Sequence, residues 1–167
     1  MAKVWKFQDN VNTDEIIPGR FYPRKNIEEL GNFCLCELHP TFSKEKKPGD
    51  IIVGGENFGC GSSREFAPIA LRYSKVRCIV AKSFARIFYR NCINLGFPIL
   101  ICRKFCDQTK EGDEIDVDLK TGTIRNITTG REYQAEPLPK FVLKIVDAGG
   151  IIDYLKNQNS ENNTDTA

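Results

Sequence analysis

The sequence predicts a single α/β domain built on a partly parallel sheet, followed by a C-terminal region of β-hairpins. A length of 167 residues fits one compact domain with its own hydrophobic core. Between residues 51 and 101, short apolar runs alternate with segments of helical periodicity, which is typical of βαβ units. After residue 113 the pattern changes to alternating apolar and polar residues separated by turns that contain Gly, which favours hairpins.

The first third of the chain predicts two strands separated by long irregular segments. Lys3 to Phe7 alternates polar and apolar residues, as a half-buried strand does. Residues 8–24 are rich in Asp, Asn, Pro and Gly and predict a loop. A short helix is expected within residues 27–38. The continuous apolar run Ile51 to Val53 predicts a strand that is buried on both faces.

The middle of the chain continues the α/β alternation. Helices are expected at residues 65–73 and 84–95, and strands at residues 76–81 and 99–101. Ser83 is predicted to cap the second of these helices, because Ser often occupies the position before the first helical residue.

The last third predicts antiparallel strands and then short helices. Strands are expected at residues 114–119, 123–127 and 131–135, and helices at residues 140–147 and 151–155. Residues 157–167 are almost wholly Asn, Ser, Thr, Asp and Glu, so they are expected to be a disordered polar tail. The predicted domain therefore spans residues 1–156.

Composition excludes several classes of function. The formal net charge of +2 lacks the strong basic excess that nucleic-acid binding usually needs. No apolar run reaches the length of a membrane helix, and the N-terminal residues lack the apolar core of a signal peptide. We therefore expect a cytoplasmic protein with neither a nucleic acid nor a membrane as partner.

The cysteines are predicted to be free thiols rather than disulfides or metal ligands. An odd number of cysteines in a reducing compartment disfavours a disulfide framework. Their spacings match no common zinc or iron–sulfur pattern, and His39 is the single histidine, so we expect no metal on this chain. The seven are Cys34, Cys36, Cys60, Cys78, Cys92, Cys102 and Cys106.

The segment Gly54 to Arg64, GGENFGCGSSR, is the candidate functional site. Its glycines can let the backbone approach a ligand, and a helix that starts just afterwards would direct its positive end to the same place. Ser62 and Ser63 supply hydroxyl groups, and Arg64 can bind a carboxylate through two hydrogen bonds. The combination predicts an anion-binding site with a candidate nucleophile or base.

Familiar glycine motifs do not fit this segment. A P-loop requires Lys where Gly61 stands, and both the dinucleotide fingerprint and the hydrolase elbow require Gly where Arg64 stands. A purely structural alternative is a strand-to-helix connection in which Ser62 and Glu65 form a capping box. That alternative would place Pro68 inside the helix, where its missing N–H is costly, and the sequence leaves this conflict open.

Three strings resemble signatures of the mobile, swivelling domain of the aconitase superfamily. NFGCGSSREFAPIAL resembles its active-site segment, and VNTDEIIPGR and AKSFARIFYRNCINLG resemble two further signatures. Their order and separations are similar to those in the separately encoded small subunits of 3-isopropylmalate dehydratase and homoaconitase. The resemblance runs from about Val4 to Leu155 and implies a swivelling β/β/α domain.

The resemblance implies a hydro-lyase site shared between two chains. In such enzymes a [4Fe–4S] cluster on the large subunit binds the substrate, and a serine alkoxide from the mobile domain removes a proton next to a carboxylate. By motif position, the base would be Ser62, and Arg64 with Ser63 would bind substrate. Asp14 matches a family position close to the substrate, although an Asp in a polar loop can also simply form a local turn. This chain would bind no cofactor and would join the large subunit in a heterodimer or heterotetramer.

The resemblance also bears on the substrate. In the family the loop that corresponds to Gly19 to Asn26 sets substrate choice. Homoaconitase-type relatives tend to carry Arg where Pro23 stands, and Arg24 follows one residue later as a further candidate for substrate binding. This departure favours isopropylmalate, a small branched hydroxy-dicarboxylate of leucine biosynthesis. Homoaconitate and dimethylmalate stay open as alternatives, as does a non-catalytic anion-binding regulatory module.

Other positions carry open alternatives. Phe66 stands where many relatives have a polar residue, which predicts a drier surrounding of the site. Arg86 and Arg90 recur at a four-residue step on the predicted helix 84–95, so they either bind substrate or the large subunit or simply face solvent.

Overall fold

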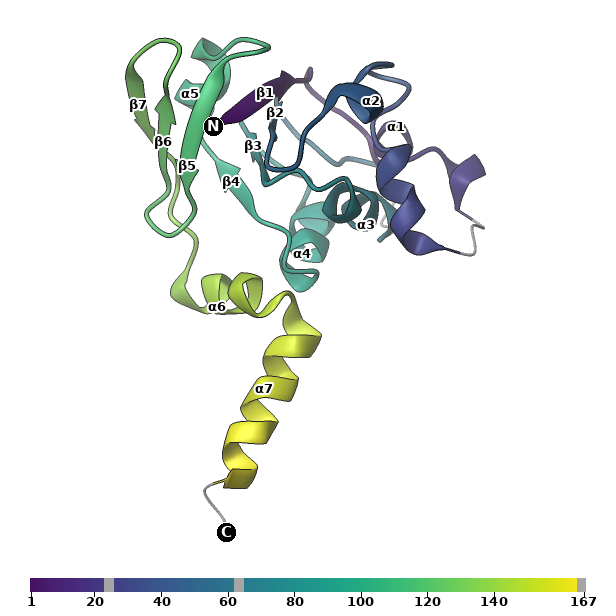
Figure 1. Cartoon of the computed structure of the whole chain (residues 1–167), viewed down its shortest axis with the longest axis vertical. Coiled ribbons are helices and arrows are strands. Elements are labelled where there is room, and N and C mark those ends of the chain that lie inside the picture. Colours follow the sequence, from purple (N-terminus) through teal and green to yellow (C-terminus); the bar gives the residue numbers. More distant parts are fainter. Residues whose placement is uncertain (23–25, 62–64, 165–167) are drawn as a thin grey trace.

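The computed structural model describes residues 1–22, 26–61 and 65–164, with side chains up to residue 160. A seven-stranded sheet organises the domain, in the order β4-β3-β2-β1-β5-β6-β7 (Figure 1). The strands are β1 Ala2–Lys6, β2 Ile51–Gly54, β3 Cys78–Ala81, β4 Ile99–Ile101, β5 Glu114–Asp118, β6 Thr123–Asn126 and β7 Arg131–Gln134.

The sheet is parallel on one side of β1 and antiparallel on the other. β1 pairs in parallel with β2 (Val4 with Ile51), and β3 and β4 extend the parallel half. On its other edge β1 pairs antiparallel with β5 (Ala2 with Ile115), and β6 and β7 complete the hairpins. The predicted fold class, a partly parallel sheet with a C-terminal hairpin region, is confirmed.

Helices and hairpins cover opposite faces of the parallel strands (Figure 1). Trp5, Ile52 and Ile79 point to the face covered by the helical segments that follow β1, β2 and β3. Their neighbours in sequence point to the other face, where α5 and strands β5–β7 pack. Because both faces are covered, β2 and β3 are continuous apolar runs rather than alternating ones, as the sequence predicts.

The helices are short and mostly follow the predicted order. They are α1 Thr13–Ile16, η1 Gly19–Phe21, η2 Ile27–Asn32, α2 Phe42–Glu45, α3 Phe66–Tyr73, α4 Arg86–Asn94, α5 Arg103–Gln108, α6 Lys140–Ala148 and α7 Ile151–Thr164, where η marks a 3-10 helix. The helix expected within residues 27–38 is the 3-10 helix η2. Among the described residues no helix is long and apolar enough to cross a bilayer.

The prediction that Ser83 caps a helix is wrong. α4 begins at Arg86, its N-cap residue is Ala85, and no side chain caps it. The residues before it are held in extended conformation, because the N–H of Phe58 donates to the carbonyl of Ser83 (3.0 Å) and the N–H of Ala85 donates to that of Phe58 (2.9 Å). These non-local bonds override the local preference of Ser for a helix start.

The C-terminal helix extends past residue 156, where composition predicts that the domain ends. α7 runs from Ile151 to Thr164, and Figure 1 shows it projecting away from the sheet. The residues expected to form a disordered tail therefore begin as exposed helix, because a helix already started by residues 151–156 adds one backbone bond for each further residue. The division at residue 156 stays a prediction.

Candidate functional site

The candidate site lies where β1 and β2 end. The carboxyl ends of parallel strands meet at one edge of a sheet, and ligands of α/β proteins commonly bind there. β1 leads into the predicted NTDEIIPGR motif and β2 leads into the glycine segment. The site motifs are therefore brought to the same edge, although they are far apart in sequence.

Backbone hydrogen bonds pair the two segments beyond the ends of their strands. The bonds alternate in direction: Gly55 N–H to Gln8 C=O (3.3 Å), Asn10 N–H to Glu56 C=O (2.8 Å), Gly59 N–H to Val11 C=O (2.7 Å) and Thr13 N–H to Cys60 C=O (2.9 Å). The last pair lies one residue before Asp14 and two residues before Ser62. The pairing thus fixes the register between the two sequence motifs of the site.

A complete capping box positions Asp14. The carboxamide oxygen of Asn12 accepts from the N–H of Glu15 (2.9 Å), and the Glu15 carboxylate accepts from the N–H of Asn12 (2.8 Å). Asp14 lies between them in the first turn of α1 with its side chain exposed. The Asn-x-x-Glu spacing is a recognisable capping signal that the sequence reasoning missed.

Four of the five predicted site residues, Ser62, Ser63, Arg64 and Arg24, lie outside the described residues. The residues that flank the first three are described. Gly61 has a left-handed backbone (φ 95°), and a Cβ added there would lie 3.5 Å from the hydroxyl oxygen of Thr13. Glu65 is the N-cap of α3, with no side-chain capping bond. In the chain, the predicted residues 62–64 therefore lie between Gly61, which is next to Thr13 of α1, and the N-terminus of α3.

The position of α3 resolves the conflict over Pro68. Since the N-cap is Glu65, Pro68 is the third residue of the helix. The first N–H groups of a helix have no partner within the helix, so the missing N–H of Pro68 removes no helical bond. Because the N-cap of α3 is Glu65, the alternative in which Ser62 caps this helix is wrong.

The glycines at 55 and 59 serve packing within the domain rather than approach to a ligand. A Cβ on Gly59 would lie 2.1 Å from Cγ of Phe88, and one on Gly55 would lie 1.9 Å from the Asp9 carboxylate. These contacts bring the glycine segment against α4 on one side and the continuation of β1 on the other.

Aromatic stacking joins the predicted specificity loop to the start of α3. The ring of Tyr22 stacks on that of Phe66 with centroids 4.6 Å apart, and Phe21 stacks on Phe33 at 4.4 Å. Arg20 forms an ion pair with Glu37, and its guanidinium lies over the ring of Phe21, 4.7 Å from the ring centroid. Phe66, the departure from many relatives, therefore provides an apolar surface for the loop. The drier surrounding of the site stays a prediction.

The buried face of α4 packs on the glycine segment, and its opposite face is exposed. Phe88 is buried against Phe58, with ring centroids 5.8 Å apart, whereas Arg86 and Arg90 are exposed. Ile87 is also 53% exposed, although its spacing from Phe88 and Cys92 along the helix would suggest a shared apolar face.

The cysteines do not fit an iron–sulfur cluster. Cluster ligands are thiolates gathered around one centre, but among the described residues no group of three or more potential metal ligands comes together. Burial raises the pKa of Cys78 and of Cys106 to about 12, which keeps both thiols protonated. Cys106 and Cys60 donate to the backbone carbonyls of Val80 and Asn10.

Comparison with known proteins agrees with this fold. Residues 38–103 match the aconitase C-terminal domain family. The isopropylmalate/citramalate isomerase small subunit of Methanocaldococcus jannaschii is 49% identical over 160 residues, 96% of this chain and 95% of that protein. The 3-isopropylmalate dehydratase small subunit of Methanosarcina acetivorans is 53% identical over 160 residues, 96% of this chain and 98% of that protein.

A solved structure shares the whole fold. The crystal structure of 3-isopropylmalate dehydratase (leuD) from M. jannaschii superimposes with a TM-score of 0.92, covers 98% of this chain and 97% of its own, and is 40% identical. The sheet, the glycine segment and the paired α1 motif thus define an aconitase-type domain. More narrowly, the chain belongs to the family of 3-isopropylmalate dehydratase small subunits, and the resemblance seen in the sequence is confirmed.

Proposed function

We propose that this chain is the small subunit of a hydro-lyase that interconverts 2-isopropylmalate and 3-isopropylmalate by dehydration and rehydration in leucine biosynthesis. The observation that carries the proposal is the backbone pairing of the α1 motif with the glycine segment, in a chain of this family. The pairing joins Thr13, next to Asp14, to Cys60, two residues before Ser62, which supports a substrate site shared by the two motifs.

The proposed site is one half of an active site. A large subunit would supply the other half, including a [4Fe–4S] cluster that would provide Lewis-acid chemistry toward the substrate. The thiols of this chain do not fit that group, so its binding is assigned to the partner. The substrate is a small branched hydroxy-dicarboxylate.

In the proposed mechanism Ser62 removes the proton from the carbon next to a substrate carboxylate. A serine hydroxyl is a very weak acid, so its anion needs nearby positive charge or N–H donors. Backbone amides of the glycine segment, the guanidinium of Arg64 and the N-terminus of α3 are the candidates for this stabilisation. Arg64 and Ser63 bind a substrate carboxylate, and Asp14 borders the same space. The hydroxyl group leaves from the neighbouring carbon, so that one water is lost and a carbon–carbon double bond forms. Rehydration then returns a proton to the carbon that lost the hydroxyl group and adds a hydroxyl group to the carbon that lost the proton.

The deciding experiment reconstitutes the chain with its large subunit under anaerobic conditions. Isopropylmalate, citramalate, homocitrate and dimethylmalate are then supplied in turn. The proposed function requires turnover of isopropylmalate by the wild-type complex. Carboxylate binding by this chain without turnover in any reconstituted complex would instead identify an anion-binding regulatory module.

Substitution of the serines tests the assignment of the base. Ser62→Ala should lower kcat by about a hundredfold or more, the usual scale for removal of a positioned acid–base group. The complex should still assemble, because only the base is lost. Ser63→Ala is the matched control, and a larger loss of kcat there than in Ser62→Ala would contradict the assignment.

A further inference from the structure

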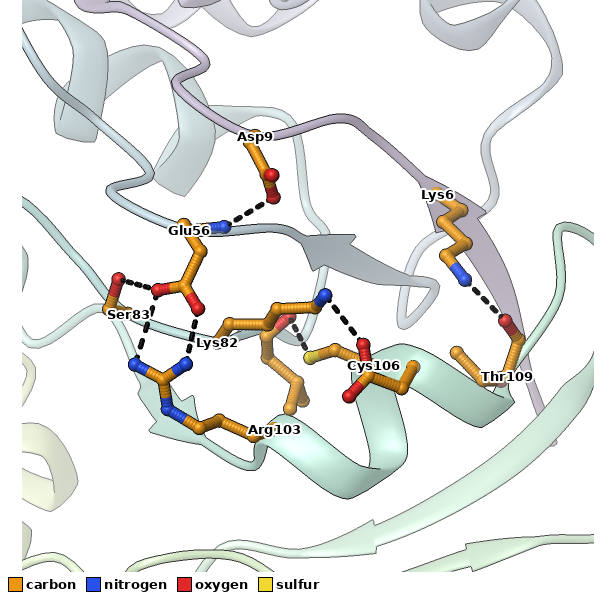
Figure 2. Close-up of polar contacts among 10 residues, drawn as sticks. Lys6, Asp9, Glu56, Lys82, Ser83, Arg103, Cys106 and Thr109 are labelled. Atoms are coloured by element: carbon orange, nitrogen blue, oxygen red, sulfur yellow. Dashed lines mark hydrogen bonds and ion pairs between the residues drawn. The ribbon is translucent and has the colours of Figure 1, made fainter.

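Glu56, at the start of the glycine segment, contacts the continuations of all the parallel strands (Figure 2). It follows β2, and its N–H donates to the carboxylate of Asp9, which follows β1 (2.7 Å). Its carboxylate accepts from the hydroxyl of Ser83, which follows β3 (2.7 Å). The remaining contact is with Arg103, the first residue of the helix that follows β4.

The contact with Arg103 is a two-bond ion pair. One guanidinium nitrogen donates to Oε2 of Glu56 (3.2 Å), and the other contacts Oε1. The hydrogen bond from Ser83 lowers the pKa of Glu56, partial burial opposes that shift, and Arg103 adds to the lowering. The carboxylate is therefore ionised at neutral pH and keeps both acceptor oxygens available.

Ser83 also hydrogen-bonds to the next two residues of the glycine segment, Asn57 and Phe58. Its hydroxyl oxygen accepts from the N–H of Asn57 (2.8 Å), and its carbonyl accepts from the N–H of Phe58 (3.0 Å). Because the Ser83 hydroxyl donates to Glu56 and accepts from Asn57, its orientation is fixed by both. The carboxylate of Glu56 thus fixes the path of the backbone that leads toward Ser62.

Stability alone does not account for such a network. The side chain of Arg103 is 63% exposed and that of Glu56 is 37% exposed, and exposed ion pairs add little to the free energy of unfolding. Correct placement of a catalytic group is a different matter, since a displacement of about 1 Å can lower a rate a hundredfold.

We propose that Glu56, held by Ser83 and Arg103, is a positioning residue for the serine segment in the hydro-lyase reaction. The proposal rests on the proposed function and deepens it, because it assigns a catalytic consequence to residues that do not contact substrate. Arg103 acts on the reaction through Glu56, and Ser83 acts through Glu56 and the backbone of Asn57 and Phe58.

A second exposed Arg–Glu pair in the chain supplies a matched control. On the β6–β7 hairpin, Nε of Arg125 donates to the carboxylate of Glu132 (2.9 Å), with side chains 63% and 61% exposed. Arg125→Ala and Arg103→Ala each remove one exposed guanidinium from one carboxylate. They differ in the place of the carboxylate, because Glu56 belongs to the glycine segment and Glu132 to the β6–β7 hairpin.

The test measures kcat, KM and melting temperature of the reconstituted complex. Arg103→Ala should lower kcat by about tenfold or more with little change in KM, and its melting temperature should match that of Arg125→Ala. Arg125→Ala should keep wild-type kcat. Arg103→Lys, which keeps the charge without the two-bond geometry, should recover part of the loss.

Amide hydrogen exchange of the isolated chain provides a readout that is independent of activity. The N–H groups of Asn57 and Phe58 should exchange faster in Arg103→Ala and Ser83→Ala than in wild type and Arg125→Ala. If the wild-type complex has no hydro-lyase activity, the proposed function itself fails. If it is active and Arg103→Ala equals Arg125→Ala in kcat, the positioning role is overturned, whatever the exchange rates.

Discussion

Asn10 and Asn57 lie side by side in the two paired segments, both in left-handed backbone conformation (φ 56° and 54°). The side-chain amide of Asn57 donates to the carboxamide oxygen of Asn10 (3.1 Å), and the N–H of Asn10 donates to the carbonyl of Glu56. Asn adopts this conformation more readily than most residues, because its short polar side chain can form local hydrogen bonds. The two segments therefore bend together at one point.

Substitution of Asn57 separates the effect of backbone conformation from that of the amide pair. Asn57→Gly keeps a favourable positive φ and should change the free energy of unfolding by less than about 0.5 kcal/mol. Asn57→Ala should destabilise by about 1–2 kcal/mol, because it loses the amide and retains a Cβ in the left-handed region. Urea unfolding measures both. Lys75, with φ 64° in the turn that follows α3, supplies the same pair of substitutions as a control. Equal losses for Gly and Ala at Asn57 would mean that the amide pair, not φ, dominates.

Gly59 tests how closely the glycine segment packs on α4. A Cβ there would lie 2.1 Å from Cγ of Phe88, a ring that is itself packed against Phe58 and Phe84. Gly59→Ala should therefore destabilise the domain by about 2–4 kcal/mol, the sum of overpacking and backbone strain.

Gly49→Ala separates these two effects, since Gly49 has a similar φ of 93° and nothing lies within 4 Å of its added Cβ. It should show the strain alone, about 1 kcal/mol. Equal melting temperatures for the two variants would contradict the close contact with Phe88.

The sequence predicts the strands and the site motifs but not the contacts that join them. Strands β2 and β3 are visible as continuous apolar runs because both faces of the sheet are covered. The glycine segment is visible by its composition. The role of Ser83 is not, because its partner Glu56 lies 27 residues away, and a Ser before a helix looks locally like a cap. The capping box of Asn12 and Glu15 is local and could have been found.

Arg24→Ala tests substrate choice. Arg24 lies outside the described residues, but its loop begins with Phe21 and Tyr22, which stack on Phe33 and Phe66. Burial of an unpaired cation against an isopropyl group would cost several kcal/mol, so Arg24 should face solvent in an isopropylmalate enzyme. Isopropylmalate turnover should therefore stay nearly unchanged in the variant. Turnover of homocitrate that is present in wild type and lost in Arg24→Ala would identify a tricarboxylate enzyme instead.

Asp113 should make the domain sensitive to acid. Burial of its carboxyl group acts to raise its pKa, but hydrogen bonds from Lys110 N–H (2.9 Å), the Asn126 amide (2.8 Å) and the Thr109 hydroxyl (3.0 Å) outweigh burial and lower it. A lowered native pKa gives stability that is complete above the unfolded value of about 3.9 and is lost as the pH falls through the native pKa.

Asp113→Asn removes this titration. The difference in free energy of unfolding between wild type and Asp113→Asn should be constant above about pH 5 and should shrink below about pH 4. Urea unfolding from pH 6 to pH 3 measures it. A difference that stays constant down to pH 3 would show that Asp113 does not titrate in this range.

The position of β1 in the middle of the sheet has a consequence for how the protein is made. β1 precedes the other six strands in the chain, yet one of its edges must wait for Ile51 in β2 and the other for Ile115 in β5. Until β5 is synthesised, β1 presents an unpaired edge that can join another chain. The parallel half and its glycine segment can form earlier, but the sheet closes over them only when most of the chain has been translated.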